Sequence, residues 1–369
     1  MHNLPVAHLV PAAARRTARV ADRLAERRDR GGSFPTIEVA ALHRHGLLHA
    51  PLPVHHGGMG LGLYAATAPI LRDVLRIIGG ASLPLGRLYE GHVNAVRLVA
   101  RFGTDRHLAM LGAEAEAGRL SAVWNAETPP GLTLEGGILA GTKRYTSGTG
   151  HVRRPVLTAT THGGVMMAIP DVAAAIGDLS EWLPTGMAAT ATGSIDFTGI
   201  AVRPGDIVGA AGDYYRSPYF AGGAWRVLAV QLGGLERLVT LYREAMATRG
   251  RSADPVQRAR FGGVLMQLET ARLWTARAAA IAEDSAQDAG TIDAFVNLAR
   301  HAFDRAALDI IERVQRGIGL SAMLRPAAVE RIARDLVTYL RQPFPDAAVD
   351  AAAGWGLATH RDMHSDLGD

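Results

Sequence analysis

A short polar stretch in the first third of the chain carries side chains that can exchange protons. The segment GRLYEGHVNAVR, residues 86–97, places Glu90, His92 and Asn94 within a helical pattern. Glu90 and Asn94 are four residues apart and share one helical face, whereas His92 lies off to the side. A carboxylate or an imidazole beside a cavity can act as a general acid or base, so Glu90 and His92 are candidates for that role. The alternative is an exposed polar surface with a hydrogen-bonded histidine.

A second candidate is a lone cation in an apolar setting. Arg226 follows AGGAW and precedes VLAV. A charge among apolar residues is costly unless it meets an anion. The pattern therefore predicts a bound anionic ligand or an acidic side chain, such as Glu236 or Asp213, beside Arg226.

Histidines and glycines elsewhere give weaker signals. The pairs in ALHRHG and VHHGG have no carboxylate at ligand spacing, and His43 and His45 cannot chelate one ion from one helical face. GGMGLG lacks the strand–helix context of a dinucleotide fingerprint. The chain has no cysteine, which excludes disulfides, iron–sulfur clusters and thiol catalysis. We therefore predict no metal site.

Composition bounds the class of protein that carries these residues. The 369 residues are 48% hydrophobic and 20% charged, as in an ordinary well-packed globular protein of two or three structural units. The formal net charge is +4, and the basic residues are scattered, so we do not expect nucleic-acid binding. No run approaches the length of a membrane span, and the first residues lack the apolar core of a signal peptide. We expect a cytoplasmic protein.

The residue patterns divide the chain into three parts and predict a mainly helical α+β fold. Apolar residues at three- and four-residue spacing predict N-terminal helices over 7–32, 36–53, 64–80 and 83–103. From Ser121 the pattern changes to short segments that are rich in β-branched residues or alternate between apolar and polar residues, separated by Gly and Pro. Helical periodicity returns after Tyr219 and predicts an antiparallel bundle of four helices over 225–249, 255–288, 293–319 and 329–342. We thus predict an N-terminal helical domain (1–120), a β-barrel-like middle domain (121–210) and a C-terminal four-helix bundle (211–369).

Five local motifs, in this order, resemble those of the acyl-CoA dehydrogenase superfamily. They are LPVHHGGMGLG, SAVWNAETP, GILAGTKRYTSG, GMAATATGSIDFTGIAVRP and QRGIGLSAMLRPAAVERIARDL. The resemblance covers nearly the whole chain and implies FAD, bound non-covalently between the β domain and the bundle. It also implies a homo-oligomer, a dimer or tetramer, in which a neighbouring subunit often completes the site.

The resemblance assigns flavin contacts to particular residues. Trp124, Ala126, Tyr145 and Ser147 would line the isoalloxazine ring. Strand amides can donate hydrogen bonds to a reduced flavin, and an aromatic side chain can pack against the flavin ring. The alternative is that these are ordinary alternating strand residues.

The cofactor's pyrophosphate would lie near the first two bundle helices. The resemblance assigns it Arg249 or Arg251, with Gln257. Gly317 and Gly319 match the last two glycines of a family motif in which the backbone approaches the dinucleotide closely. The alternative for both arginines is a solvated loop charge.

The chain departs from the family where the catalytic base should be. Aligned on Arg334 and Asp335, the usual glutamate falls on Pro343, and the alternative position on the first bundle helix falls on Ala224. Asp346, three residues past Pro343, is a possible substitute, although an aspartate after proline is commonly a turn or cap residue. In the family the helix carrying Glu90 and His92 passes near the substrate cavity, and a flavin or substrate anion could meet Arg226.

These observations predict an FAD-dependent oxidoreductase with a rearranged site. The small-molecule substrate would be an acyl thioester, on CoA or acyl carrier protein, or a related carbonyl compound. A carboxylate is the usual base for removing the proton beside the carbonyl. The alternatives are a flavin monooxygenase or oxidase on the same fold, which needs no such base, and a non-catalytic flavin-binding partner subunit.

Overall fold

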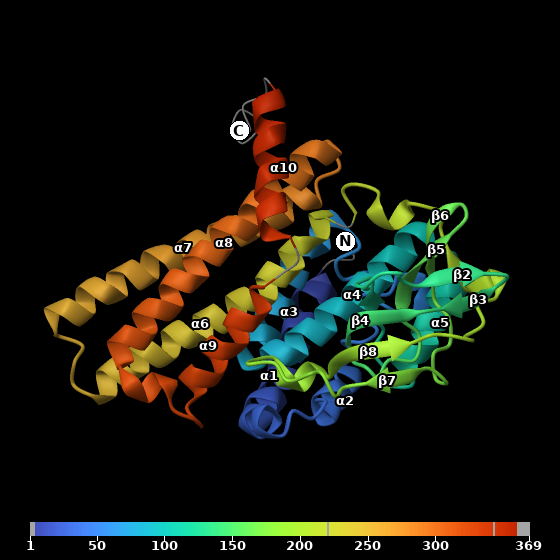
Figure 1. Ribbon diagram of the computed structural model, residues 1–369. Helices are drawn as coiled ribbons and strands as arrows, with labels where there is room; N and C mark the ends of the chain where they lie inside the picture. The colour runs from blue at the N-terminus through green and yellow to red at the C-terminus, as the bar shows by residue number, and fades with distance from the viewer. Residues whose placement is uncertain (1–3, 220, 342–343, 360–369) are drawn as a thin grey trace.

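The computed structural model describes residues 4–219, 221–341 and 344–359, and Figure 1 shows their arrangement. Helices come first, strands occupy the middle of the chain, and long helices return towards the C-terminus. The predicted fold class is therefore confirmed. None of the described helices is both long and apolar enough to cross a bilayer.

The N-terminal part is helical. Its helices are α1 (Leu4–Gly31), α2 (Thr36–Arg44), α3 (Ala68–Ala81), α4 (Leu83–Phe102) and α5 (Asp105–Glu116), with short 3₁₀ turns η1 (Val54–His56) and η2 (Ala65–Thr67). We predicted a helix over 36–53, but α2 ends at Arg44 because the chain turns at Gly46, whose φ is +75°. We did not predict α5, although Thr104 and His107 form a capping box at its start.

The middle part contains two sheets. The larger has the order β3-β2-β5-β6-β9, with β1 pairing parallel to β5; the smaller has the order β4-β8-β7. Their strands are β1 (Val123–Trp124), β2 (Thr133–Glu135), β3 (Ile138–Ala140), β4 (Thr142–Ser147), β5 (Val156–Thr161), β6 (Gly164–Ala168), β7 (Ile176–Asp178), β8 (Thr192–Asp196) and β9 (Ile207–Val208). Strand β1 contacts both β4 and α4, so one edge of the sheet region meets the helices.

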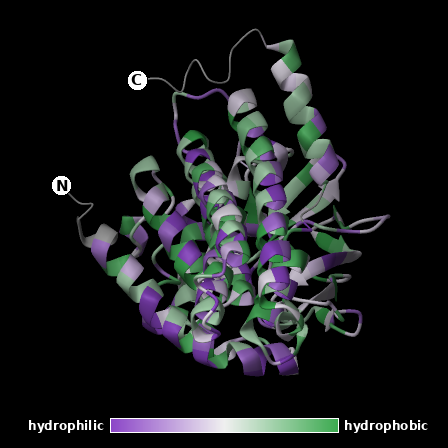
Figure 2. Cartoon of the chain, turned by 90° about the vertical axis from the view of Figure 1, so that its left-hand side faces the viewer, coloured by the Kyte–Doolittle hydropathy of each residue, from purple (hydrophilic) through white to green (hydrophobic). Residues whose placement is uncertain are grey.

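The C-terminal part is built from long helices with defined starts. They are α6 (Trp225–Thr248), α7 (Pro255–Ala282), α8 (Ala289–Ile318), α9 (Ala328–Tyr339) and α10 (Pro345–Ala358). Asp254 caps α7 and Asp288 caps α8, each accepting hydrogen bonds from backbone amides of the first turn. Helix α10, which we did not predict, packs on α8 and projects from the body at the top of Figure 1. Apolar and polar residues alternate along the helices in Figure 2.

Helices α3 and α6 approach closely enough for their backbones to touch. A Cβ at Gly233 on α6 would lie 2.0 Å from the carbonyl oxygen of Arg76 on α3. A Cβ at Gly79 on α3 would lie 2.1 Å from the carbonyl oxygen of Val230 on α6. Because a backbone atom cannot move aside as a side chain can, this contact requires glycine on both helices. It holds the N-terminal helices against the bundle.

A single methyl group at this contact should destabilise the protein. We expect Gly233→Ala to lower the free energy of unfolding by about 2 to 3 kcal/mol, since the helices must separate to accept it. Urea titration followed by circular dichroism measures the change. Gly262→Ala is the matched control, because nothing lies within 4 Å of a Cβ at this helical glycine; it should stabilise the protein by about 0.5 to 1 kcal/mol. Equal effects of the two substitutions would contradict the close contact.

Candidate functional site

A large cleft lies where the three parts of the chain meet. Its volume is about 2030 Å³, larger than the roughly 300 to 1,000 Å³ of ordinary small-molecule pockets. Its wall includes Glu90 of α4, Ser147 of β4, Arg226 of α6 and Tyr339 of α9, and Asp346 of α10 contributes to its lining. The cleft therefore has room for a cofactor together with a substrate, and every part of the fold contributes to it.

A buried polar network joins α4 to α6 along the cleft wall. Glu90 is 1% exposed, and its Oε2 lies 2.5 Å from Nη1 of Arg87. Asn94 donates from Nδ2 to the other carboxylate oxygen of Glu90. Arg226 then donates from Nε to Oδ1 of Asn94, over 2.5 Å. Both oxygens of Glu90 are thus engaged, and this residue anchors the network.

Arg226 meets its anion at the end of α7. Its Nη1 lies 3.4 Å from Oε1 of Glu283, and the indole of Trp225 donates to the same oxygen over 3.1 Å. Arg97 of α4 contacts the other oxygen of Glu283 at 2.8 Å. Burial, helped by the nearby Arg97, lowers the pKa of Arg226 to about 9, which leaves it charged at neutral pH.

Arg226 does meet an acidic side chain, as one of the two predictions had it, but not Glu236 or Asp213, the residues named for that role. Glu236 pairs with Arg76 and Arg272, and Asp213 pairs with Arg216. Glu283 replaces them because the end of α7 folds back to the start of α6, a contact that sequence spacing does not encode. Arg226 is therefore committed to protein groups.

His92 has a structural position. It is fully buried and does not line the cleft. Its Nε2 lies 2.8 Å from the carbonyl oxygen of Leu48, and its Nδ1 accepts from the amide of Ser121 over 3.0 Å. These bonds require a neutral ring, and burial lowers the pKa of His92 to about 4. The predicted acid–base role is thus not supported, and the alternative of a hydrogen-bonded histidine describes it.

The strand residues predicted to contact a flavin divide into two groups. Ala126, Tyr145 and Ser147 line the cleft. Trp124 is buried behind them, where its Nε1 donates to the carbonyl oxygen of Ser147 over 3.1 Å. The Ser147 hydroxyl lies 2.9 Å from that of Thr192 on β8. This wall offers hydroxyl groups and an aromatic ring.

Tyr145 owes its orientation to a break in β4. The pairing of β4 with β8 shifts register between Lys143 and Thr146, and Tyr145 has a φ of +55°. Its side chain is 66% exposed although it belongs to a strand. A non-glycine residue in the left-handed region is costly, and such strain is concentrated at binding sites.

Sequence reasoning missed the polar group beside this wall. Asn125, which lines the cleft, accepts from the hydroxyls of Thr158 and Tyr215, over 2.7 and 3.1 Å. Lys143 is buried beneath, donating to the carbonyl of Asn125 over 3.0 Å and pairing with Glu127. Burial lowers the pKa of Lys143. The lysine was visible in the motif GTKRYTSG, but its partners come from other segments of the chain.

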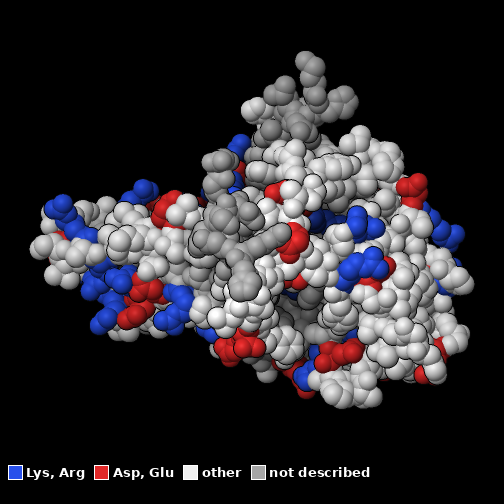
Figure 3. Space-filling view, turned by 90° about the horizontal axis from the view of Figure 1, so that it is seen from above, with Lys and Arg blue, Asp and Glu red and all other residues white. Residues whose placement is uncertain are grey.

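The residues predicted for the pyrophosphate do not lie at the cleft. Arg249 donates to the carbonyl of Ile318 and the hydroxyl of Ser321, over 2.6 and 2.7 Å, and Arg251 pairs with Asp254. This is the far end of the bundle, at the left of Figures 1 and 3. Basic side chains there are mixed with acidic ones in Figure 3. The pyrophosphate role remains a prediction.

Packing accounts for the glycines at the same end. A Cβ at Gly317 would lie 2.4 Å from the hydroxyl oxygen of Tyr242, which donates to Gln257 over 2.7 Å. Gly319 has a φ of +81° where α8 ends. Gly317, Gly319 and Gln257 thus have reasons within the chain itself.

Asp346 and Asp304 are carboxylates of the cleft lining that could act as a base. Asp346 is exposed in the first turn of α10, as expected for a residue near a helix start, and Pro343 lies outside the described residues. Asp304 on α8 lines the cleft, and its Oδ1 is buried with no hydrogen-bond partner within the described part of the chain. Asp304 lies in none of the motifs found in the sequence, so sequence reasoning did not identify it.

A buried aspartate positions the loop at the cleft. Asp335 of α9 is 3% exposed and accepts a hydrogen bond from the amide of Met187, over 2.6 Å. Met187 lines the cleft with a φ of +64°. Burial raises the pKa of Asp335 to about 6, partly offset by the hydrogen bond.

Sequence comparison identifies two sets of similar proteins. Residues 8–109 match the family described as "Acyl-CoA dehydrogenase, N-terminal domain". The dibenzothiophene monooxygenase of Rhodococcus erythropolis is 28% identical over 256 residues, which cover 62% of this chain and 60% of that protein. The chain therefore matches only part of the length of that relative.

Structure comparison supports the same fold over nearly the whole chain. FMN-bound TdsC from Paenibacillus sp. A11-2 has a TM-score of 0.81 at 21% identity, covering 96% of this chain and 98% of that one. Butyryl-CoA dehydrogenase from Megasphaera elsdenii has a TM-score of 0.83 at 17% identity, covering 95% and 98%. At these identities, the similarity establishes the fold.

Removing the anion at the end of α7 should destabilise the protein. Glu283→Gln keeps the shape but leaves Arg226 and Arg97 without a carboxylate, so we expect a loss of about 3 kcal/mol in unfolding free energy. Urea titration measures it. Glu312→Gln is the control, since Glu312 and Arg316 form an exposed pair at 3.1 Å, worth about 0.5 kcal/mol or less. If Glu283→Gln is as mild as the control, Arg226 does not depend on this pair.

The buried Asp335 predicts a pH-dependent stability difference. Its folded pKa is about 6, against about 3.9 in an unfolded chain. The folded state therefore binds the proton more tightly, and this contribution to stability is present below about pH 4 and lost as the pH rises through 6. Relative to wild type, the free energy of unfolding of Asp335→Asn should therefore increase by about 3 kcal/mol between pH 4 and pH 7.

Urea titrations at both pH values test this difference, because other titrating groups cancel between the two proteins. Asp346→Asn is the control, because Asp346 is exposed on α10. Its difference in unfolding free energy from wild type should change by less than about 0.5 kcal/mol between the two pH values. If the stability difference between Asp335→Asn and wild type does not change with pH, burial does not raise the pKa of Asp335.

Proposed function

We propose that the chain, which resembles the acyl-CoA dehydrogenase family in sequence over residues 8–109 and in fold over nearly its whole length, is a flavin-dependent oxidoreductase. Within that class we propose a monooxygenase, which inserts one atom of O₂ into a small organic substrate. The observation that carries this choice is the engagement of Glu90. Its carboxylate oxygens are held by Arg87 and Asn94, so Glu90 is not free to remove a substrate proton.

The strand wall of the cleft suits a flavin. Ala126, Tyr145 and Ser147 would hold the ring, with the Tyr145 side chain against it and the hydroxyls of Ser147 and Thr192 at its polar edge. A bound reduced flavin supplies the electrons for oxygen activation. The residues around it would bind, orient and exclude water.

We propose FMN in place of the FAD expected from sequence. Arg249, predicted to meet the pyrophosphate, already donates to Ile318 and Ser321 of its own chain. It lies at the end of the bundle away from the cleft. The TdsC relative is also described as FMN-bound. Contacts to an adenosine half would have to come from a second copy of the chain.

The lining of the cleft suits a flat, apolar substrate more than an anionic one. Aromatic side chains contribute much of it: Tyr64, Tyr145, Trp182, Tyr214, Tyr215, Tyr219 and Phe344. Arg226, which could have bound a substrate carboxylate, is committed to Asn94 and Glu283. Aromatic rings bind aromatic substrates by stacking and by apolar contact. We therefore propose an aromatic or heteroaromatic substrate.

We propose that the chain forms a dimer or tetramer through its bundle. Helix α7 carries Val256, Leu265, Met266 and Leu273 on its surface, each 48% to 67% exposed. Exposed apolar residues gathered on one element commonly mark an interface. A second copy is the partner that the family resemblance implies.

The dehydrogenase predicted from sequence is the second candidate, and Asp304 is the observation that favours it. Within the described residues its Oδ1 has no hydrogen-bond partner, so this carboxylate is free to accept a proton, whereas Glu90 is not. An acyl-CoA dehydrogenase would need a carboxylate to take the proton beside the thioester carbonyl. The monooxygenase requires no such base, so the two functions predict different behaviour of one variant.

The test supplies the purified protein with FMN, a flavin reductase, NADH and a panel of aromatic heterocycles under ¹⁸O₂. We expect an oxygenated product that contains ¹⁸O. Ser147→Ala should lower its rate by about ten- to a hundredfold, if the hydroxyl orients the flavin. Asp304→Asn should change it by less than about twofold, because no base is required.

Acyl-CoA thioesters provide the opposing measurement. Under anaerobic conditions they should not bleach the bound flavin of the wild-type protein. The dehydrogenase would be established instead if an acyl-CoA bleaches the flavin and Asp304→Asn lowers the rate of bleaching by more than about a hundredfold. Absence of flavin binding would contradict both candidates.

A further inference from the structure

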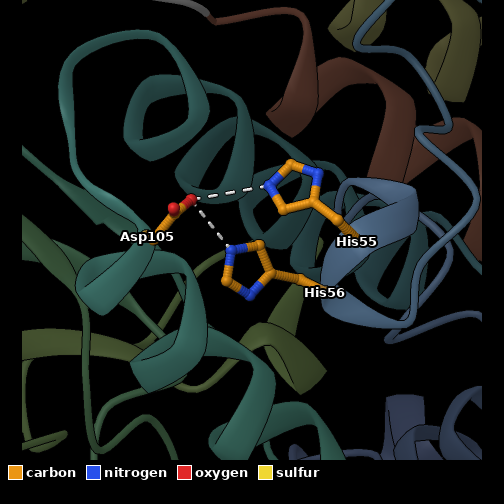
Figure 4. A group of neighbouring side chains, drawn as sticks. All are labelled: His55, His56 and Asp105. Atoms are coloured by element: carbon orange, nitrogen blue, oxygen red, sulfur yellow. Dashed lines mark hydrogen bonds and ion pairs between the residues drawn. The ribbon is translucent and has the colours of Figure 1, made fainter.

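Two adjacent histidines and one aspartate converge at the mouth of the cleft. His55 and His56 form the end of the turn η1, and Asp105 is the first residue of α5. Figure 4 shows both rings directed at the carboxylate. Nε2 of His55 lies 3.5 Å from Oδ1 of Asp105, and Nε2 of His56 lies 3.2 Å from the same oxygen.

Two of the three separations between the ligand atoms match those of a tetrahedral metal site. Two ligands that are each about 2.0 to 2.1 Å from a tetrahedral Zn²⁺ lie about 3.3 to 3.4 Å apart. The two histidine–aspartate separations are close to this value, and one ligand atom from each of the three residues lies within 4.8 Å of the others. A cation could therefore bind all three with small side-chain rotations.

Hydrogen bonds alone give a weaker account of the cluster. The 3.5 Å separation of His55 from Asp105 is too long for a good hydrogen bond. The Asp105 side chain is 83% exposed and that of His55 is 66% exposed, and ion pairs at such sites contribute little to stability. Two rings that gather around one carboxylate oxygen are better explained by a shared ligand.

We propose that His55, His56 and Asp105 bind one divalent transition-metal ion, for which Zn²⁺ is the probe. Two imidazole nitrogens and one carboxylate oxygen form a borderline ligand set, which selects such ions over Mg²⁺ or Ca²⁺. The exposure of His55 and Asp105 leaves room for water to complete the coordination. This inference does not depend on the proposed redox function.

The position of the site gives the ion a local role. His55 and Asp105 both line the cleft, and η1 and α5 are in contact. A bound cation would link the turn to the helix across the mouth of the cleft and place positive charge there. The fold brings Asp105 to His56, which is 49 residues away in sequence, and to its neighbour His55, which explains why sequence spacing predicted no metal site.

The test is isothermal titration of untagged, chelator-treated protein with ZnCl₂. We expect one equivalent to bind with a Kd of about 1 μM or lower, and zinc to raise the Tm. Asp105→Asn should weaken binding by at least about a hundredfold, because a neutral amide is a poor zinc ligand. His55→Ala should weaken it comparably, and both changes lie at exposed side chains that the fold does not need.

Glu116→Gln is the matched control. Glu116 pairs with His49 at 3.2 Å on the surface of the same part of the chain, but no third ligand joins them within the described residues. This variant should bind zinc as wild type does. The proposal is overturned if wild type shows no saturable binding up to about 1 mM, or if Asp105→Asn and His55→Ala bind zinc as tightly as Glu116→Gln does.

Discussion

The buried charge of Arg226 is the constraint on which this structure depends. A guanidinium inside a protein is costly unless an anion and hydrogen-bond acceptors surround it. Asn94 from α4 and Glu283 from the end of α7 supply them. One side chain thereby determines where three helices meet, and they meet at the wall of the cleft. Gly79 and Gly233 separately allow α3 to pack closely against α6.

The same network limits the chemistry available at the cleft. Glu90 has the charge and position of a base, but its oxygens bind Arg87 and Asn94, and Asn94 in turn holds Arg226. Freeing Glu90 for proton transfer would weaken the junction between α4 and α6. A site whose carboxylate maintains the fold is better suited to reactions in which the cofactor activates oxygen than to proton abstraction by that carboxylate.

Helices with a long periodic pattern were predictable, and short elements were not. Helices α4 and α6 follow their predicted ranges closely, because three- and four-residue spacing of apolar residues directly reflects helix geometry. Strand β2 is only three residues long, and the buried apolar residues of α5 are only Leu108, Leu111 and Ala115, which is too few for a clear pattern. Among the site residues at the cleft, Tyr145 and Ser147 were found from a motif and Glu90 from a polar helical stretch. Asn125 lies within the motif SAVWNAETP but was assigned no role, and Asp304 lies in no motif.

The sequence by itself determined the fold class and the order of its parts, and it indicated a resemblance to the acyl-CoA dehydrogenase superfamily, because these follow from periodicity and from motifs that are local in the chain. Only the tertiary structure decided which residues are free to act. It paired Arg226 with Glu283, enclosed His92 between Leu48 and Ser121, and brought Asp105 to His55 and His56. Each of these contacts joins residues that are tens of positions apart. Availability for chemistry depends on such partners, and sequence spacing cannot specify them.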